Sequence, residues 1–92
     1  MSAGRGGRPG AHEPVAPPKT LPGFPGAVVG KPKALPGRKL RPRWNLPDGT
    51  FLEFDRMHGT VEKYDRYGRH QGEFATDGRQ LKPANPNYTA EP

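Results

Sequence analysis

Asp55, His58 and Glu62 lie within one short stretch of the sequence and could together perform acid–base chemistry. The His58-Gly59 pair between them predicts the turn of a β-hairpin. A loop centred on that pair places Asp55 directly opposite Glu62, and the alternation of strand side chains puts both on one face. Like charges that face each other destabilise a hairpin, so the pattern favours a catalytic site over a packed surface. The same register pairs Glu53 with Tyr64 and Met57 with Thr60.

An imidazole beside two carboxylates supplies what phosphodiester transfer in RNA requires. One group takes the proton of the ribose 2′-hydroxyl, another protonates the leaving 5′-oxygen, and a cation stabilises the phosphorane. This scheme needs no cofactor and no metal, and the three histidines lack the spacing of a zinc motif. The same residues are also compatible with a solvated acidic face and a turn histidine. Tyr64 and Tyr67 either stack on bases or pack on the sheet, and His70 either contacts substrate or has a structural role.

The elements that must position these residues are indicated by turn signals. Glycine after aspartate favours the left-handed conformation of a tight hairpin turn. Such signals recur about every ten residues: Pro47-Asp48-Gly49-Thr50, His58-Gly59, Tyr67-Gly68 and Asp77-Gly78. They predict a mainly β fold, a small antiparallel meander of about five strands near residues 42–46, 50–56, 60–66, 70–75 and 79–83. Its core is expected on the face opposite the carboxylates, from Leu52, Phe54 and Val61 together with Trp44, Phe74 and Leu81.

Proline, glycine and positive charge are concentrated in the first half of the chain. Residues 1–44 contain nine Lys/Arg against one acid, whereas residues 45–92 contain six Lys/Arg against eight acids. We expect a Pro/Gly-rich basic linker or disordered arm, largely irregular, over residues 1–39 and an ordered domain over residues 40–92. Val28-Val29 is a weak candidate for a further edge strand. A basic arm suits an anionic polymer or surface, RNA above all, or serves only as a tether.

The composition excludes several classes of protein. The chain has no cysteine, hence neither a disulfide framework nor thiolate chemistry. No apolar run approaches the length of a membrane span, and the N-terminus lacks the apolar core of a signal peptide. We therefore expect no stable membrane insertion, and an exported protein would leave by another route or as the end of a larger chain.

Residues 40–86 resemble the cytotoxic ribonuclease domain of the E3-type colicins and cloacin, and the tips of related bacteriocins and contact-dependent toxins. The resemblance runs through Arg43-Trp44, Phe54-Asp55-x-x-His58-Gly59-x-x-Glu62-x-Tyr64, Gly68-x-His70-x-Gly72-x-Phe74 and Gln80-Leu81-Lys82 with a following Pro86. It implies a highly twisted antiparallel sheet that cleaves 16S ribosomal RNA once, in the decoding centre, and so stops translation. It also implies a metal-independent endoribonuclease with Glu62 as general base, His58 as general acid or charge stabiliser, and Asp55 orienting them.

The resemblance further implies partners and a place of action. These are the ribosome and a small acidic immunity protein that binds the nuclease, itself a monomer. The toxin would be secreted or delivered and would act in the cytoplasm of the target bacterium, as the tip of a longer toxin or as a stand-alone cassette.

Two positions depart from the family pattern. The family requires an arginine near its C-terminus, where this chain has Asn85-Pro86-Asn87-Tyr88-Thr89, and Thr60 stands in place of a second carboxylate. We expect the supporting groups among Lys82, Arg79 and Arg56 for the cation, with Tyr64 and His70 contacting RNA. Three alternatives stay open: a ribonuclease toxin with another target such as tRNA, a non-catalytic RNA-binding β-domain, and an adaptor that docks through its Pro-rich arm.

Overall fold

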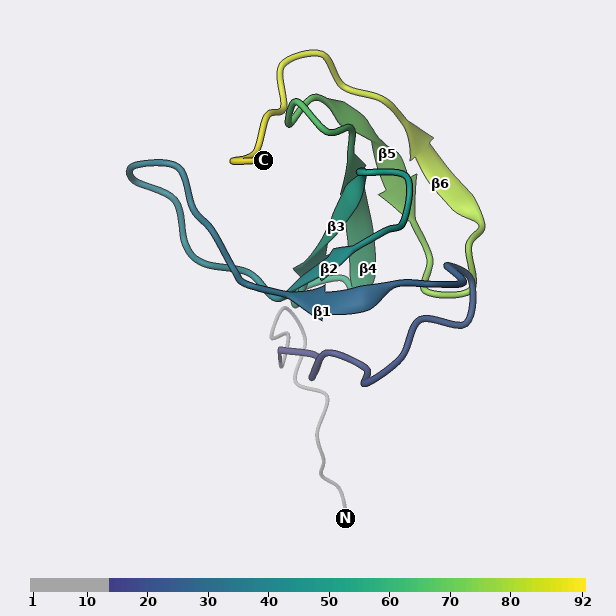
Figure 1. Cartoon of the computed structure of the whole chain (residues 1–92). Helices are drawn as coiled ribbons and strands as arrows, with labels where there is room; N and C mark the ends of the chain where they lie inside the picture. The colour runs from purple at the N-terminus through teal and green to yellow at the C-terminus, as the bar shows by residue number, and fades with distance from the viewer. Residues whose placement is uncertain (1–13) are drawn as a thin grey trace.

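The computed structural model describes residues 14–92, which form one strongly twisted antiparallel sheet (Figure 1). Six strands follow one another as a meander, each paired with the next along the chain. They are β1 (Val28–Gly30), β2 (Arg43–Asn45), β3 (Phe51–Asp55), β4 (Thr60–Tyr64), β5 (His70–Phe74) and β6 (Gln80–Pro83). The predicted mainly β meander is confirmed, with one strand more than expected. Residues 14–92 contain no helix long and apolar enough to cross a membrane.

The loops after β2, β4 and β5 share one construction. In each, a glycine N–H donates to the carbonyl three residues earlier, at 2.9–3.1 Å, and the glycine φ is between 84° and 96°. Glycine takes this left-handed conformation at little cost, so the predicted turn signals at Gly49, Gly68 and Gly78 are confirmed. These turns fix the order in which the strands return across the sheet.

The hairpin of β3 and β4 has a different register from the predicted one. Its loop contains the four residues 56–59 rather than two, and the Gly59 N–H closes it by donating to the Asp55 carbonyl at 2.8 Å. Asp55 therefore faces Thr60, and Glu53 faces Glu62. A slip of two positions keeps every side chain on its face, so Asp55 and Glu62 still share one. The predicted pairs are wrong: Asp55 with Glu62, Glu53 with Tyr64, and Met57 with Thr60.

The hydrophobic core covers the opposite face of the sheet, as predicted. Leu52, Phe54 and Val61 are at most 1% exposed, and the Trp44 ring packs edge-on against Phe54 with centroids 6.1 Å apart. Phe74 packs against the same cluster. These side chains anchor the middle of the sheet, so that the carboxylate face is built on a fixed support.

Leu81 does not belong to the core, contrary to the prediction. The pairing of β5 with β6 shifts between Glu73 and Phe74, which leaves Leu81 as an extra residue in β6. A bulge of this kind interrupts the alternation of side chains. Leu81 is consequently 45% exposed.

Part of the Pro/Gly-rich arm packs on the sheet. Leu21 and Phe24 are buried in the core, where the Phe24 ring meets Phe74 edge-on at 5.8 Å. The Gly23 N–H donates to the Thr76 carbonyl at 3.0 Å, and β1 supplies the edge strand that Val28-Val29 suggested. Apart from β1, residues 14–42 have irregular backbone, as expected. The expectation for residues 1–13 lies outside the described residues.

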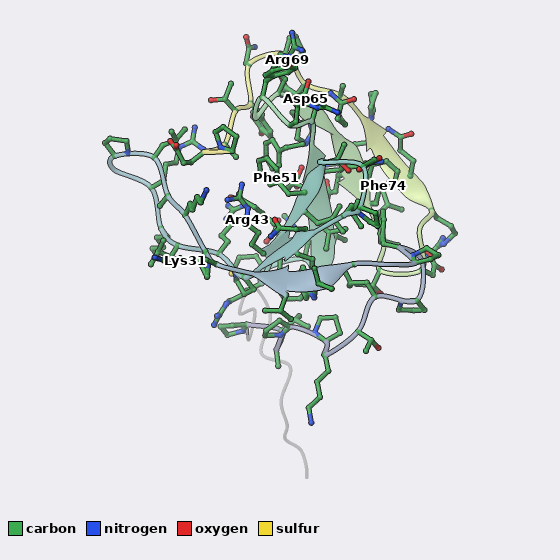
Figure 2. All side chains as sticks on the ribbon, viewed as in Figure 1. Lys31, Arg43, Phe51, Asp65, Arg69 and Phe74 are labelled. Atoms are coloured by element: carbon green, nitrogen blue, oxygen red, sulfur yellow. The ribbon has the colours of Figure 1, made fainter. Side chains whose placement is uncertain are left out.

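The C-terminal segment returns across the end of the sheet (Figure 1). Tyr88 and Ala90 form backbone hydrogen bonds with the start of β5 and the preceding turn, and Ala90 packs in one buried cluster with Phe51 and Tyr64. Arg43 donates to the Glu91 carbonyl and lies 3.7 Å from the centre of the Phe51 ring (Figure 2). This segment thus becomes one wall beside the carboxylate face.

Candidate functional site

A row of charged side chains crosses the carboxylate face from β2 to β6. Arg43 faces Glu53, Glu53 faces Glu62, Glu62 faces Glu73, and Glu73 faces Lys82. All three glutamates are buried at 8% exposure. Neighbouring like charges on a sheet are destabilising, and buried carboxylates cost more than exposed ones. The sequence prediction of opposed carboxylates is therefore correct in kind, but it chose the wrong pair.

A bulge in β5 brings Glu73 into this row. Tyr64 faces His70 while Lys63 faces Gly72, so Gln71 is an extra residue. His70 and Glu73 consequently lie on one face, although a regular strand would place residues three apart on opposite faces. This irregularity explains why the period-two pattern did not identify Glu73 as a site residue.

Glu62 is fixed by His70. The His70 Nε2 and the Glu62 Oε1 are 2.5 Å apart, and the His70 Nδ1 accepts the Asn85 backbone N–H at 2.9 Å. Because Nδ1 accepts, the ring proton lies on Nε2 and is donated to the carboxylate. The side chain of His70 is 3% exposed, and its ring packs edge-on against both Tyr64 and Tyr88. The Glu62 carboxylate therefore has one held oxygen and one directed away from His70.

His58 forms a second histidine–carboxylate contact, with Asp55, at the hairpin loop. The Asp55 Oδ2 lies 2.6 Å from the His58 Nδ1, and its Oδ1 accepts the Met57 N–H at 2.8 Å. Burial raises the pKa of Asp55, but the hydrogen bonds from His58 and Met57 outweigh burial and leave that pKa lowered. The hydrogen bond and the charge of Asp55 raise the pKa of His58, whose side chain is 68% exposed. The pair thus favours a protonated imidazole at an open rim.

The Glu73 carboxylate, on β5, contacts one residue on β4 and one on β6. Its Oε2 accepts the Thr60 hydroxyl at 2.6 Å, and its Oε1 lies 3.7 Å from the Lys82 Nζ. Potential ligand atoms of Asp55, His58 and Glu73 all lie within 4.8 Å of one another, which is close enough to share a metal ion. One imidazole and two carboxylates are donors that zinc accepts. Metal independence therefore stays a prediction, which a chelator tests.

Tyr64 lies on the carboxylate face, two residues after Glu62 in β4. Its ring stacks on Phe51 with centroids 5.3 Å apart and an interplanar angle of 17°. Burial, followed by the charges of Glu53 and Glu62, raises the pKa of Tyr64 to about 12, so its hydroxyl stays protonated at neutral pH. Burial likewise raises the pKa of Glu53, against the opposing charges of Arg43, Arg41 and Arg38.

The described residues enclose a hollow of about 760 Å³ over this face. Six of the residues predicted for the site line it: Asp55, His58, Glu62, Tyr64, His70 and Lys82. Arg56 lines a neighbouring hollow of about 420 Å³ instead. Arg79 lines neither, and its Nε is held 2.9 Å from Asp77 in the turn before β6. Arg56 thus shares a hollow with Asp55 and Tyr64 but not with His58 or Glu62, and Arg79 shares neither hollow with them.

Of the lining residues that sequence reasoning did not assign to the site, three are charged: Glu73, Arg38 and Arg41. Arg38 lies in the predicted Pro/Gly-rich arm and Arg41 two residues after its end, and both were interpreted only as part of the general basic charge of the first half of the chain. The sequence around the two arginines did not indicate where they lie in the fold, because a proline- and glycine-rich stretch does not specify where it folds back. The other lining residues come from the C-terminal stretch: Pro83, Ala84, Asn85, Pro86 and Tyr88.

Comparison with known protein families gives one match. A family model described as Cytotoxic matches residues 15–91. A search of curated proteins found no match. The matched range includes β1, the packed residues Leu21 and Phe24, and the whole carboxylate face.

Proposed function

Since the chain belongs to the family of cytotoxic domains of colicin E3-type ribonuclease toxins, we propose that it is an endoribonuclease that cuts 16S ribosomal RNA in the decoding centre. The family membership supports a toxin domain of the nuclease type. The proposal of a specific RNA-cleaving reaction rests on one observation: Asp55, His58 and Glu62 line the same hollow. A hollow of that size receives an unstacked nucleotide and its phosphate, as single-stranded RNA recognition requires.

The proposed reaction assigns each proton to an atom. The free oxygen of the Glu62 carboxylate takes the proton of the ribose 2′-hydroxyl, and the resulting 2′-oxygen attacks the adjacent phosphorus. The bond from phosphorus to the 5′-oxygen breaks, and His58 gives its proton to that oxygen. The products are a 2′,3′-cyclic phosphate and a free 5′-hydroxyl. No electron transfer and no covalent enzyme intermediate is needed.

The electrostatics support this division of roles. The Asp55 carboxylate raises the pKa of His58, which favours the proton that a general acid must hold. Glu62 accepts the His70 N–H, which orients its carboxylate for the role of base. Asp55 acts through His58, and we propose it as a positioning residue.

The test is cleavage of intact bacterial ribosomes in EDTA, followed by gel analysis and sequencing of the RNA ends. We expect one discrete 3′ fragment of 16S RNA. His58→Ala and Glu62→Ala should each slow cleavage at least about a hundredfold, the usual scale for a positioned acid or base. Asp77→Asn is the matched control, because Asp77 pairs with Arg79 outside the hollow.

Other results would contradict the proposal in distinct ways. Cuts in tRNA alone would identify another target, and salt-dependent RNA binding without cleavage would identify a non-catalytic domain. Loss of activity in EDTA that added zinc restores would make the reaction metal-dependent, with Asp55, His58 and Glu73 as the ligands to test. Full activity in both substituted proteins would show that the site is elsewhere.

We also propose the partners and the place of action that follow from this activity. The enzyme would act as a monomer in the cytoplasm of the target bacterium after secretion or delivery. A small acidic immunity protein would block it, with charge steering the association. Titration with the product of a neighbouring gene, with cleavage as the readout, would test that pairing.

A further inference from the structure

The proposed reaction needs a cation at the phosphate, and the three predicted candidates do not provide a free one. Lys82 lies in the hollow, but its Nζ is 3.7 Å from the Glu73 carboxylate. Arg79 is held by Asp77, and Arg56 lines only the neighbouring hollow, whereas Arg38 and Arg41 line both. Three buried glutamates and Asp55 make this face repel a phosphate unless positive charge is added from elsewhere.

Arg38 and Arg41 add that charge from the loop between β1 and β2. Both line the hollow that contains Asp55, His58 and Glu62. Both are exposed, and neither forms an ion pair or a side-chain hydrogen bond with any residue in the range 14–92. Their charges also act on Tyr64, where they oppose the rise of its pKa. Two unpaired guanidinium groups thus face a hollow whose floor is acidic.

The loop that carries them is fixed at several points. The Arg38 N–H donates to the Leu35 carbonyl at 3.0 Å across the Pro36-Gly37 turn, in which Gly37 has a φ of 79°. Lys33 donates to the Pro92 carbonyl at 2.8 Å, near the loop's start. At its end, the Pro42 carbonyl accepts the Phe54 N–H at 2.9 Å. Figure 1 shows this loop as the long projection between β1 and β2, with the C-terminus returning towards it.

We propose that Arg38 and Arg41 bind the phosphate at the cleaved bond and stabilise the charge of the phosphorane. This inference rests on the proposed ribonuclease activity and names its missing cation. Guanidinium is suited to the role because its planar fork donates two parallel hydrogen bonds to phosphate oxygens and never loses its proton at physiological pH. The loop between β1 and β2 is then part of the catalytic machinery rather than only a tether.

The first measurement is the single-turnover cleavage rate at saturating ribosome concentration. Arg38→Gln and Arg41→Gln should each reduce it about tenfold, and the double variant about a hundredfold or more, the scale of lost transition-state donors. Arg38→Lys and Arg41→Lys should recover part of the rate. Arg66→Gln is the matched control, since this exposed arginine lines neither hollow and should keep the full rate. Thermal melting of each variant separates a folding defect from a loss of catalysis.

A second measurement does not depend on cleavage. A short RNA with 2′-O-methyl groups, which cannot be cut, is titrated into the protein while the arginine Nε–H signals are followed by NMR. Shifts of the Arg38 and Arg41 signals, with weaker binding by the double variant, support the proposal. An unchanged single-turnover rate in the double variant, or binding that moves neither signal, overturns it. If His58→Ala and Glu62→Ala still cleave, the proposed function fails instead, whatever the arginine variants do.

Discussion

His70 is a buried side chain that holds the carboxylate of another buried residue, Glu62. It donates to Glu62 and accepts from the Asn85 backbone, so two roles can be separated by substitution. His70→Gln keeps a donor near the Nε2 position, whereas His70→Asn keeps an acceptor near the Nδ1 position. We expect the glutamine variant to retain more cleavage activity than the asparagine variant, with alanine lowest at about a tenfold to hundredfold loss. Single-turnover rates check this, and equal losses for all three would contradict a positioning role.

Asp55 and His58 predict a dependence on pH. Because the folded pKa of His58 is raised, its pairing stabilises the protein fully below the unfolded pKa, and this stabilisation is lost as pH rises through the folded value. The folded pKa of Asp55 is lowered, so its pairing stabilises the protein above the unfolded pKa of Asp55. This stabilisation is lost as pH falls through the folded pKa. Asp55→Asn should lower the His58 pKa and shift the alkaline limb of the pH–rate profile to lower pH. An NMR titration of the His58 ring protons in both proteins measures the shift; an unmoved pKa would refute it.

At the scale of elements, periodicity predicted which residues share a face but not which residues meet. The alternation over residues 51–64 correctly separated Leu52, Phe54 and Val61 from the carboxylates. It could not give the loop length, since a two-residue slip preserves both faces. Nor could it locate the bulges at Gln71 and Leu81, because a bulge depends on how two strands pair. The acidic row is therefore a product of pairing between strands, which a single strand's sequence does not contain.

The packing of the arm on the sheet leads to a prediction about the free energy of unfolding. Leu21 is buried against the core ahead of β1, so Leu21→Ala should lower the free energy of unfolding by about 2–5 kcal/mol. Val29→Ala is the control, because Val29 is 76% exposed and its truncation should change stability by no more than about 0.5 kcal/mol. Urea unfolding measures both. Equal, small effects would mean that the arm does not contribute to the core.

At the scale of the whole molecule, charge is divided between the two halves of the chain, and the fold brings the halves together. The acidic floor comes from β3, β4 and β5, while the two arginines that line the hollow come from the loop after β1. Neither half alone has the charge pattern that a phosphate requires. Under the proposed function, binding and catalysis would depend on different residues of the basic first half of the chain, since Arg38 and Arg41 line the hollow but Lys31 does not.

This division predicts how salt affects the reaction. Lysines that neutralise phosphates release counterions, so the apparent affinity for ribosomes should fall steeply as salt rises. Lys31, at the base of the loop in Figure 2, and Lys39 are exposed and lie outside the hollow that contains Asp55, His58 and Glu62. Lys31→Gln with Lys39→Gln should reduce the slope of log affinity against log salt by about 1 for each phosphate that is no longer neutralised, while the single-turnover rate at saturation stays unchanged. Arg38→Gln with Arg41→Gln should lower that rate even at low salt, because we propose that those charges act on the transition state. If both pairs changed only the salt slope, the arm would serve for attraction alone, and the cation of the reaction would have to come from Lys82.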